Sequence, residues 1–148
     1  MSAEESKAVM RRFWEVWEQG NIDLLDELLA PEYINHTLAT PDLPPGREGV
    51  KEVVSMFHSA MPDLRVVVED MIAEGHKVAT RYALEGTHKG ELFGATPTGR
   101  QLSIKSMTVE RVSEGKIIEH WRVTDELEMM RQLGAIGTPE NNPTSTEE

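Results

Sequence analysis

Residues 116–134 read KIIEHWRVTDELEMMRQLG, an apparent strand that turns directly into a short helix, with Asp125 at the junction. Alternate side chains of a strand share a face, so Trp121 and Asp125 are expected to point the same way as Ile117. A carboxyl group that loses hydration beside an indole ring is suited to proton transfer near neutral pH. Asp125 is therefore a candidate general acid/base, and a plain helix N-cap is the alternative.

Composition limits the class of protein before other motifs are weighed. The 148 residues predict one domain, long enough for a core with a ligand cavity. The chain has no cysteine, which excludes disulfides and thiolate chemistry and predicts a reducing, cytoplasmic setting. The formal net charge of -11, with scattered Lys and Arg residues, argues against nucleic acid as a partner. The opening residues do not resemble a signal peptide and no stretch is apolar enough to span a membrane, so a soluble protein is expected.

The first half of the chain has helical periodicity. Apolar residues recur at three- and four-residue steps over about residues 3–19, and a second short helix is expected over residues 22–30. Residues 33–38 read as an extended or looped segment before the proline-rich TPDLPPG. A third helix is expected over residues 47–61, closed by the proline that follows.

The second half changes to the period and composition of strands. The expected strands, rich in Val, Ile and Thr, are residues 64–71, 77–85, 102–112 and 116–125. Successive hairpins predict an antiparallel, twisted sheet, and helices followed by strands predict an α+β fold with the helices on one face. The polar residues 135–148 are expected to form a flexible C-terminal tail, which leaves 1–134 as a single α+β domain.

Besides this order of helices and strands, the chain contains four distinctive sequence motifs: MPDL (61–64), GTHKGELFGATPTGR (86–100), EGKIIEHW (114–121) and D-x-L-x-M-x-R-Q-L-G (125–134). Together they resemble the SnoaL-like polyketide cyclase (ester cyclase) family of the nuclear transport factor 2-like superfamily, over nearly the whole chain. The resemblance implies a cone-shaped fold, in which N-terminal helices pack on a curved, mainly antiparallel sheet that encloses a cavity. It also implies cofactor-free intramolecular aldol-type ring closure, or a related isomerisation, of a small apolar carbonyl compound. The general acid/base of the family, at the end of the last long strand, corresponds to Asp125.

Polar candidates for substrate binding lie near the expected cavity. Asn35 and His36 lie where the chain enters it, and an amide beside an imidazole can hold a carbonyl or enolate oxygen. Loop hydrogen bonding is the alternative for both. The resemblance puts His88 near the cavity rim, with turn stabilisation as an equal alternative. His120 is expected to be structural or interfacial.

The tryptophans complete the predicted cavity wall. Trp14 and Trp17 on the first helix, together with Trp121, are predicted to shape an apolar pocket, with core packing as the more common role of such residues. The histidines show neither the i, i+4 spacing of a helical metal site nor the i, i+2 spacing of a strand site. We therefore expect no metal and no other cofactor.

A second proton-handling group is harder to find in the sequence. Arg81 lies in a mostly apolar strand and is expected to reach Glu119 or Glu85 as a buried ion pair, which either orients the site or serves ordinary sheet pairing. In SMTVERV (106–112), where several family cyclases carry a histidine, this chain offers hydroxyl groups and a methionine. Hydroxyl groups do not titrate near neutrality, so the partner of the acid is not identified.

Three classes of function stay open at this point. The first is the cofactor-free cyclase or isomerase with Asp125 as acid/base. The second is an epoxide-hydrolase-like hydrolase, for which only Asp125 with Arg81 is visible. The third is a non-catalytic small-molecule binding or dimerisation module. In each case the alternating Val, Ile and Met residues of the outer sheet face, together with the resemblance, predict a homodimer.

Overall fold

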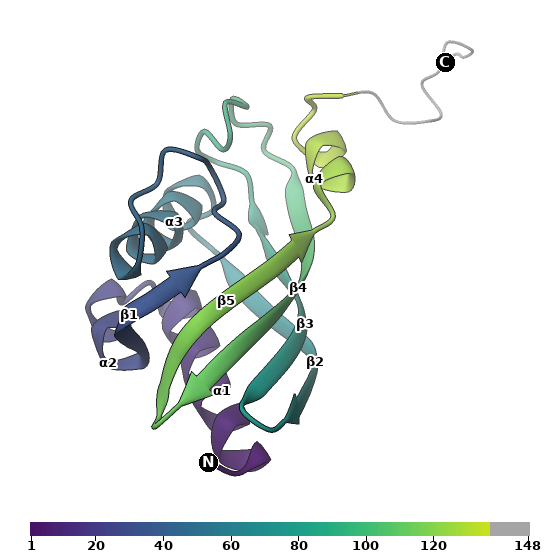
Figure 1. Cartoon of the computed structure of the whole chain (residues 1–148). Helices are drawn as coiled ribbons and strands as arrows, with labels where there is room; N and C mark the ends of the chain where they lie inside the picture. Colours follow the sequence, from purple (N-terminus) through teal and green to yellow (C-terminus); the bar gives the residue numbers. More distant parts are fainter. Residues whose placement is uncertain (137–148) are drawn as a thin grey trace.

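The computed structural model describes residues 1–136, which form helices packed on one five-stranded sheet (Figure 1). The helices are α1 (Ala3–Gln19), the short 3-10 helix η1 (Ile22–Leu24), α2 (Leu25–Leu28), α3 (Arg47–Ala60) and α4 (Glu126–Gln132). The strands are β1 (Leu29–Asn35), β2 (Arg65–Glu74), β3 (Lys77–Thr87), β4 (Gln101–Ser113) and β5 (Lys116–Thr124). The strand order is β1-β5-β4-β3-β2, with β1 parallel to β5 and the other neighbours antiparallel. The predicted α+β fold with a mainly antiparallel sheet is confirmed.

The sheet is strongly curved, and α1, α2 and α3 gather on one side of it, whereas α4 lies at the end of β5 (Figure 1). Helix α1 begins with a capping box, because the Ser2 hydroxyl accepts from the Glu5 main-chain nitrogen and the Glu5 carboxylate accepts from the Ser2 nitrogen. Its apolar stripe faces the sheet and is buried, as the residues Met10, Phe13, Trp14, Val16 and Trp17 show. The core thus lies between α1 and the inner, concave face of the sheet.

Side chains of β4 alternate regularly between the two faces of the sheet. The inner, buried positions are Leu102, Ile104, Ser106, Thr108, Glu110 and Val112. The outer position Met107 is 53% exposed. Cross-strand pairing extends the inner row to both neighbours of β4, since Ser106 pairs with Tyr82 of β3 and with Thr124 of β5. The inner face is therefore polar in the middle of the sheet.

Strand β5 does not alternate as its sequence predicts, because a β-bulge interrupts its pairing with β4. Ile117 pairs with Val112, whereas Glu119 pairs with Arg111, which leaves Ile118 as an extra residue. Ile117 is buried on the inner face together with its partner. Every side chain after the bulge lies on the opposite face from the one that simple alternation assigns to it.

The bulge determines which residues of β5 face the helices. After it, the inner positions are His120, Arg122 and Thr124, which pair with inner positions of β4. The outer positions are Glu119, Trp121 and Val123, and the Val123 side chain is 77% exposed. The prediction that Trp121 shares a face with Ile117 is therefore wrong.

The predicted helix over residues 22–30 is shorter in the structure. It consists of η1 and the single turn α2, and the chain then enters β1 at Leu29. Pro31 is tolerated there because β1 lies at the edge of the sheet, where one missing amide donor costs little. The segment predicted as an extended entry, residues 33–38, begins as the end of this parallel edge strand.

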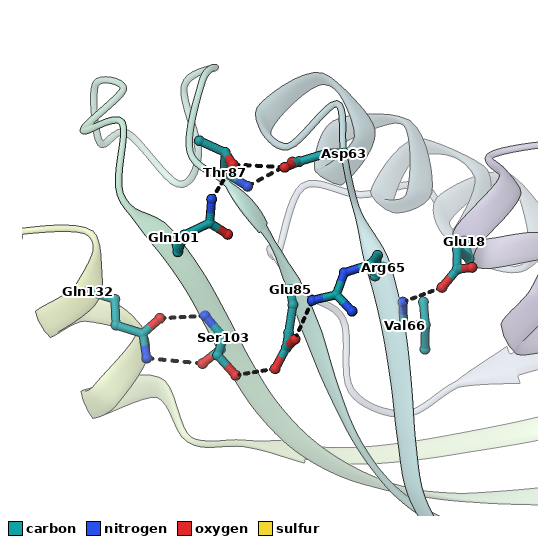
Figure 2. Close-up of polar contacts among 9 residues, drawn as sticks. All are labelled: Glu18, Asp63, Arg65, Val66, Glu85, Thr87, Gln101, Ser103 and Gln132. Carbon is teal, nitrogen blue, oxygen red and sulfur yellow. Dashed lines mark hydrogen bonds and ion pairs between the residues drawn. The ribbon is translucent and has the colours of Figure 1, made fainter.

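Helix α4 is tied to β4 by its last residue. The Gln132 side-chain oxygen accepts from the Ser103 main-chain nitrogen at 2.8 Å, and its nitrogen donates to the Ser103 carbonyl oxygen at 3.0 Å (Figure 2). The Ser103 hydroxyl donates to Glu85 at 3.1 Å, and Arg65 donates to the same carboxylate at 2.9 Å (Figure 2). This chain of contacts holds α4 at one end of the sheet.

Two expectations fall partly outside the described residues. Residues 137–148 are not described, so the flexible tail and the boundary of the domain at residue 134 stay predictions. Within residues 1–136, no helix has both the length and the apolar character needed to cross a membrane.

Candidate active site

A cavity of about 230 Å³ lies between the inner sheet face and the helices. Trp17 from α1, Phe57 from α3 and Met129 from α4 supply apolar parts of its wall. The sheet contributes polar groups, among them those of Tyr82 and Arg122. An apolar wall with a few polar groups is the usual form of a site for a small organic molecule.

A smaller pocket of about 40 Å³ adjoins this cavity, and Trp17, Tyr82 and Arg122 form part of both walls. We call it the inner pocket. Its other polar and aromatic lining includes Trp14, Tyr33, Asn35 and His120. The predicted positions of Trp14 and Trp17 in a cavity wall agree with this lining; the binding roles of both stay predictions.

Glu110 and His120 form a buried pair on neighbouring strands. Glu110 Oε2 lies 2.6 Å from His120 Nδ1, and Glu110 Oε1 accepts from the Thr108 hydroxyl at 2.8 Å. The Glu110 side chain is 1% exposed and that of His120 10%. An ionised Glu110 can only accept hydrogen bonds, so Nδ1 of His120 is then the donor, and His120 itself lines the inner pocket.

Asn35 lies directly beside this pair, because it is the β1 neighbour of His120 in the sheet. Its Oδ1 atom accepts from the Thr37 main-chain nitrogen at 2.8 Å. The amide NH₂ group remains to donate to a ligand oxygen in the inner pocket, which Asn35 also lines.

Arg122 occupies the next inner position of β5 and is half-buried. Its Nε donates to the Thr124 hydroxyl at 3.1 Å, and that hydroxyl lies 2.8 Å from the Ser106 hydroxyl. Its main-chain nitrogen donates to the Thr37 hydroxyl, also at 3.1 Å. These contacts engage the main-chain nitrogen and Nε, and they leave the two terminal guanidinium nitrogens without a hydrogen-bond partner among residues 1–136.

Two buried tyrosines, Tyr33 and Tyr82, line the inner pocket together with Arg122. Burial raises the pKa of Tyr82 to about 12, and the nearby Arg122 guanidinium offsets part of the rise. Burial also raises the pKa of Tyr33 above its ordinary value, an effect that the Glu110 charge increases and the Arg122 charge opposes. Both phenols are therefore neutral hydrogen-bond donors at neutral pH.

Asp125 lies outside the cavity wall. Its carboxylate accepts from the Glu128 main-chain nitrogen at 3.2 Å, so it is the N-cap of α4. It lines a separate groove with the outer residues Arg81, Met107 and Val123, and Tyr82, Ser106 and Thr124 of the cavity wall also contribute to this groove. The capping alternative is thus realised in the structure, while a role of Asp125 in proton transfer stays a prediction.

His36 and Trp121 form a stacked pair on the outer face, with ring centroids 4.6 Å apart and an interplanar angle of 6°. The expected place of Trp121 in the cavity wall is a wrong prediction, because the bulge turns its side chain outward. His36 Nε2 lies 3.0 Å from Glu119, which also accepts from Arg111 Nε at 2.6 Å. The hydrogen bond from Arg111, followed by that from His36, lowers the pKa of Glu119.

His88 and Arg81 also lie away from the cavity lining. His88 is fully buried in the loop after β3, where its Nδ1 lies 3.0 Å from the Thr98 hydroxyl, which supports the turn-stabilising alternative. Arg81 is half-exposed on the outer face and pairs with Glu69 and, at 3.9 Å, with Asp70. The expected pairing of Arg81 with Glu119 or Glu85 is wrong, because Arg81 lies opposite Asp70 of β2.

The sequence predictions missed Glu110 and Arg122 and gave His120 a structural or interfacial role. Glu110 could have been found from the alternation of side chains along β4. It occupies the same inner set of every-second positions as the apolar and hydroxyl residues before it. His120 pairs with Glu110 and Arg122 pairs with Thr108 of the same inner set, so both follow once the bulge is known. Within residues 1–136, no group of three or more His, Asp or Glu side chains is placed to hold a metal ion.

These features define an α+β fold with a cavity beside a polar, partly ionisable inner sheet face. A family model described as SnoaL-like polyketide cyclase matches residues 7–133. The aklanonic acid methyl ester cyclase DauD from Streptomyces sp. (strain C5) is 32% identical over 129 residues, which is 85% of this chain and 80% of that protein. The chain belongs to the SnoaL-like polyketide cyclase family.

Solved structures agree with this assignment. TsrD from Streptomyces laurentii superposes with a TM-score of 0.83 at 27% identity, covering 92% of this chain and 99% of that one. IdmH from Streptomyces antibioticus is 34% identical with a TM-score of 0.75, covering 87% of this chain and 98% of that one. The predicted family and its cone-shaped fold are confirmed.

Proposed function

We propose that this protein catalyses a cofactor-free intramolecular aldol-type ring closure, or a related isomerisation, of a small and largely apolar carbonyl compound. The family model of SnoaL-like polyketide cyclases and the relatives named as methyl ester cyclases support the reaction class. The cavity of about 230 Å³ supports a small substrate. We expect the enzyme to act in the cytoplasm, as its lack of cysteine predicts.

One observation carries the proposal: the buried Glu110–His120 pair, with His120 lining the inner pocket. We assign the general acid/base role to His120 Nε2, which takes a proton from the acidic carbon next to a substrate carbonyl. The resulting enolate carbon attacks a second carbonyl carbon of the same molecule and forms the new carbon–carbon bond. The alkoxide then receives the proton from His120, so no proton is gained or lost overall.

Charge that develops on substrate oxygens needs donors that are already in place. Tyr82 and the amide of Asn35 line the cavity or its inner pocket and can donate to an enolate or alkoxide oxygen. Glu110 has a positioning role in this scheme, because it holds His120 in one tautomer. The apolar wall limits competing contacts of the intermediate with water.

The competing assignment is Asp125 as general acid/base, which rests on the family resemblance. Matched variants separate the two: His120→Gln and Asp125→Asn, assayed with aklanonic acid methyl ester, its free acid and short linear diketones that close a ring. We expect His120→Gln to lower turnover about 100-fold or more, the usual contribution of an acid/base group. We expect Asp125→Asn to keep activity within a few-fold.

The reverse pattern would move the acid/base role to Asp125. A wild-type protein that closes no ring in this panel, but hydrolyses epoxides, favours the hydrolase alternative. Saturable binding of the same compounds with no product favours the non-catalytic binding module. Chromatographic detection of product, with circular dichroism of each variant to check folding, distinguishes these results.

We further propose that the outer sheet face pairs with a second copy of the chain. Apolar side chains on this face are well exposed, with Ile34 at 51%, Met107 at 53% and Val123 at 77%. Three such residues on neighbouring strands β1, β4 and β5 form an apolar surface of the kind that marks an interface. A C2 dimer would cover the same patch on both protomers.

A further inference from the structure

Arg122 differs from the other arginines in the described part of the chain. Five of them pair with a carboxylate: Arg47, Arg65, Arg81, Arg111 and Arg131. Three more are exposed to solvent: Arg11, Arg12 and Arg100. Arg122 alone is both partly removed from solvent and without an ion pair among residues 1–136. A guanidinium in that position is incompletely compensated, which favours an anion that arrives from outside.

The nearby carboxylates do not serve as this anion. Both oxygens of Glu110 are engaged, one by Thr108 and one by His120. Glu126 lines the cavity from α4, but it is exposed and makes no ion pair with Arg122. The terminal nitrogens of Arg122 therefore keep their hydrogen-bonding capacity for a ligand in the cavity.

The shape of this donor group selects the chemistry of the ligand. Because Thr124 occupies Nε, the two terminal nitrogens present a fork of N–H groups, which matches the two oxygens of a carboxylate. The remaining wall is largely apolar, with Trp17, Phe57 and Met129. A ligand that satisfies both features has a carboxylate at one end and an apolar ring or chain at the other.

We propose that the natural substrate of this cavity is a free carboxylic acid, bound through Arg122, rather than a neutral methyl ester. This inference rests on the proposed function for the identity of the site, and it specifies the class of substrate. The relative DauD is named for a methyl ester, in which the carboxylate charge is masked. Selectivity for the free acid would distinguish this chain from that relative.

Binding of naphthoate, naphthamide and methyl naphthoate to the full chain tests the inference without any turnover. Trp14 and Trp17 line the cavity and its inner pocket, so quenching of their fluorescence reports occupancy, and calorimetry provides the dissociation constants. We expect naphthoate to bind at least about tenfold more tightly than the amide or the ester, as a charged hydrogen bond predicts. Arg122→Gln should remove this preference while changing the binding of naphthamide less than about threefold.

The control variant is Arg12→Gln, which removes an exposed arginine of α1 and should leave the preference unchanged. Equal binding of acid and amide by the wild type, or a preference that survives in Arg122→Gln, overturns the inference. If Arg122→Gln does not fold, the wild-type comparison of the three ligands still decides. His120→Gln should keep the acid preference, so a failure of the proposed catalytic role is distinguishable from a failure of this inference.

Discussion

The two faces of β5 have opposite characters. The inner face, toward the helices, carries His120, Arg122 and Thr124, whereas the outer face carries exposed Val123 beside Trp121. In a sheet that served only to form a core, the inner face would be apolar and the outer face polar. An ionisable inner face suggests a site for chemistry, and an exposed apolar outer face suggests a site for association.

Each face also has an acidic and a basic side chain in close contact. On the inner face Glu110 lies 2.6 Å from His120, and on the outer face Glu119 lies 2.6 Å from Arg111. The distances are equal, but the Glu110 side chain is 1% exposed and that of Glu119 is 25% exposed. Burial, not geometry, should therefore decide how much each pair matters for stability.

The largest effect is expected from Glu110→Ala. Removal of the Glu110 carboxylate leaves the buried His120 ring nitrogen and the Thr108 hydroxyl without their acceptor, and we expect the free energy of unfolding to fall by about 1–3 kcal/mol. Urea denaturation followed by circular dichroism measures this loss. Glu119→Ala is the matched control on the outer face and should lose much less, because solvent screens that pair. Equal losses in the two variants would contradict the distinction between the faces.

The fold itself follows largely from periodicity in the sequence. Helices α1 and α3 were predicted to within a residue or so, because a wide apolar stripe at helical spacing is typical of an amphipathic helix that packs on a core. The four long strands were also predicted, with boundary errors of a few residues. The sequence does not predict the edge strand β1, because Pro31 and the helical pattern that precedes it argue against a strand there.

The site was less predictable, for a specific reason. The single extra residue Ile118 moves every later side chain of β5 to the opposite face of the sheet. No feature of the local amino-acid composition indicates this bulge. Simple alternation therefore predicts Trp121 and Asp125 on the cavity side, where the structure has His120 and Arg122. Trp14 and Trp17 were placed correctly in the cavity wall, because the helix that carries them has no comparable irregularity.

An intermediate effect is expected from Val123→Lys on the outer face. At 77% exposure, Val123 contributes little to the core, so the stability of the folded protomer should change by no more than about 0.5 kcal/mol. A lysine in a proposed apolar interface, however, would face its own copy or its neighbours and oppose association. Sedimentation at micromolar concentration should show a dimer for the wild type and a monomer for the variant.

The control for this experiment is Ser55→Lys, an exposed position on α3 that lies away from the outer sheet face and should remain dimeric. A wild-type chain that sediments as a monomer would reject the proposed dimer. A Val123→Lys variant that stays dimeric would show that association uses another surface. Either result would leave the exposed apolar residues of the outer face without the role proposed for them.

The smallest effect, and the most specific, is the pH dependence of the Glu119 contacts. Since Arg111 and His36 lower the pKa of Glu119 in the folded protein, the unfolded chain binds a proton here more readily than the folded one. The stabilisation is thus fully present above the unfolded pKa of about 4.3 and is lost as the pH falls through the lower, folded value. The stability difference between wild type and Glu119→Gln should shrink as the pH falls from 5 toward 3. Thermal unfolding of both proteins across this range measures it, and a difference that persists undiminished at the acidic end would mean that shape, rather than charge, accounts for the Glu119 contacts on the outer face.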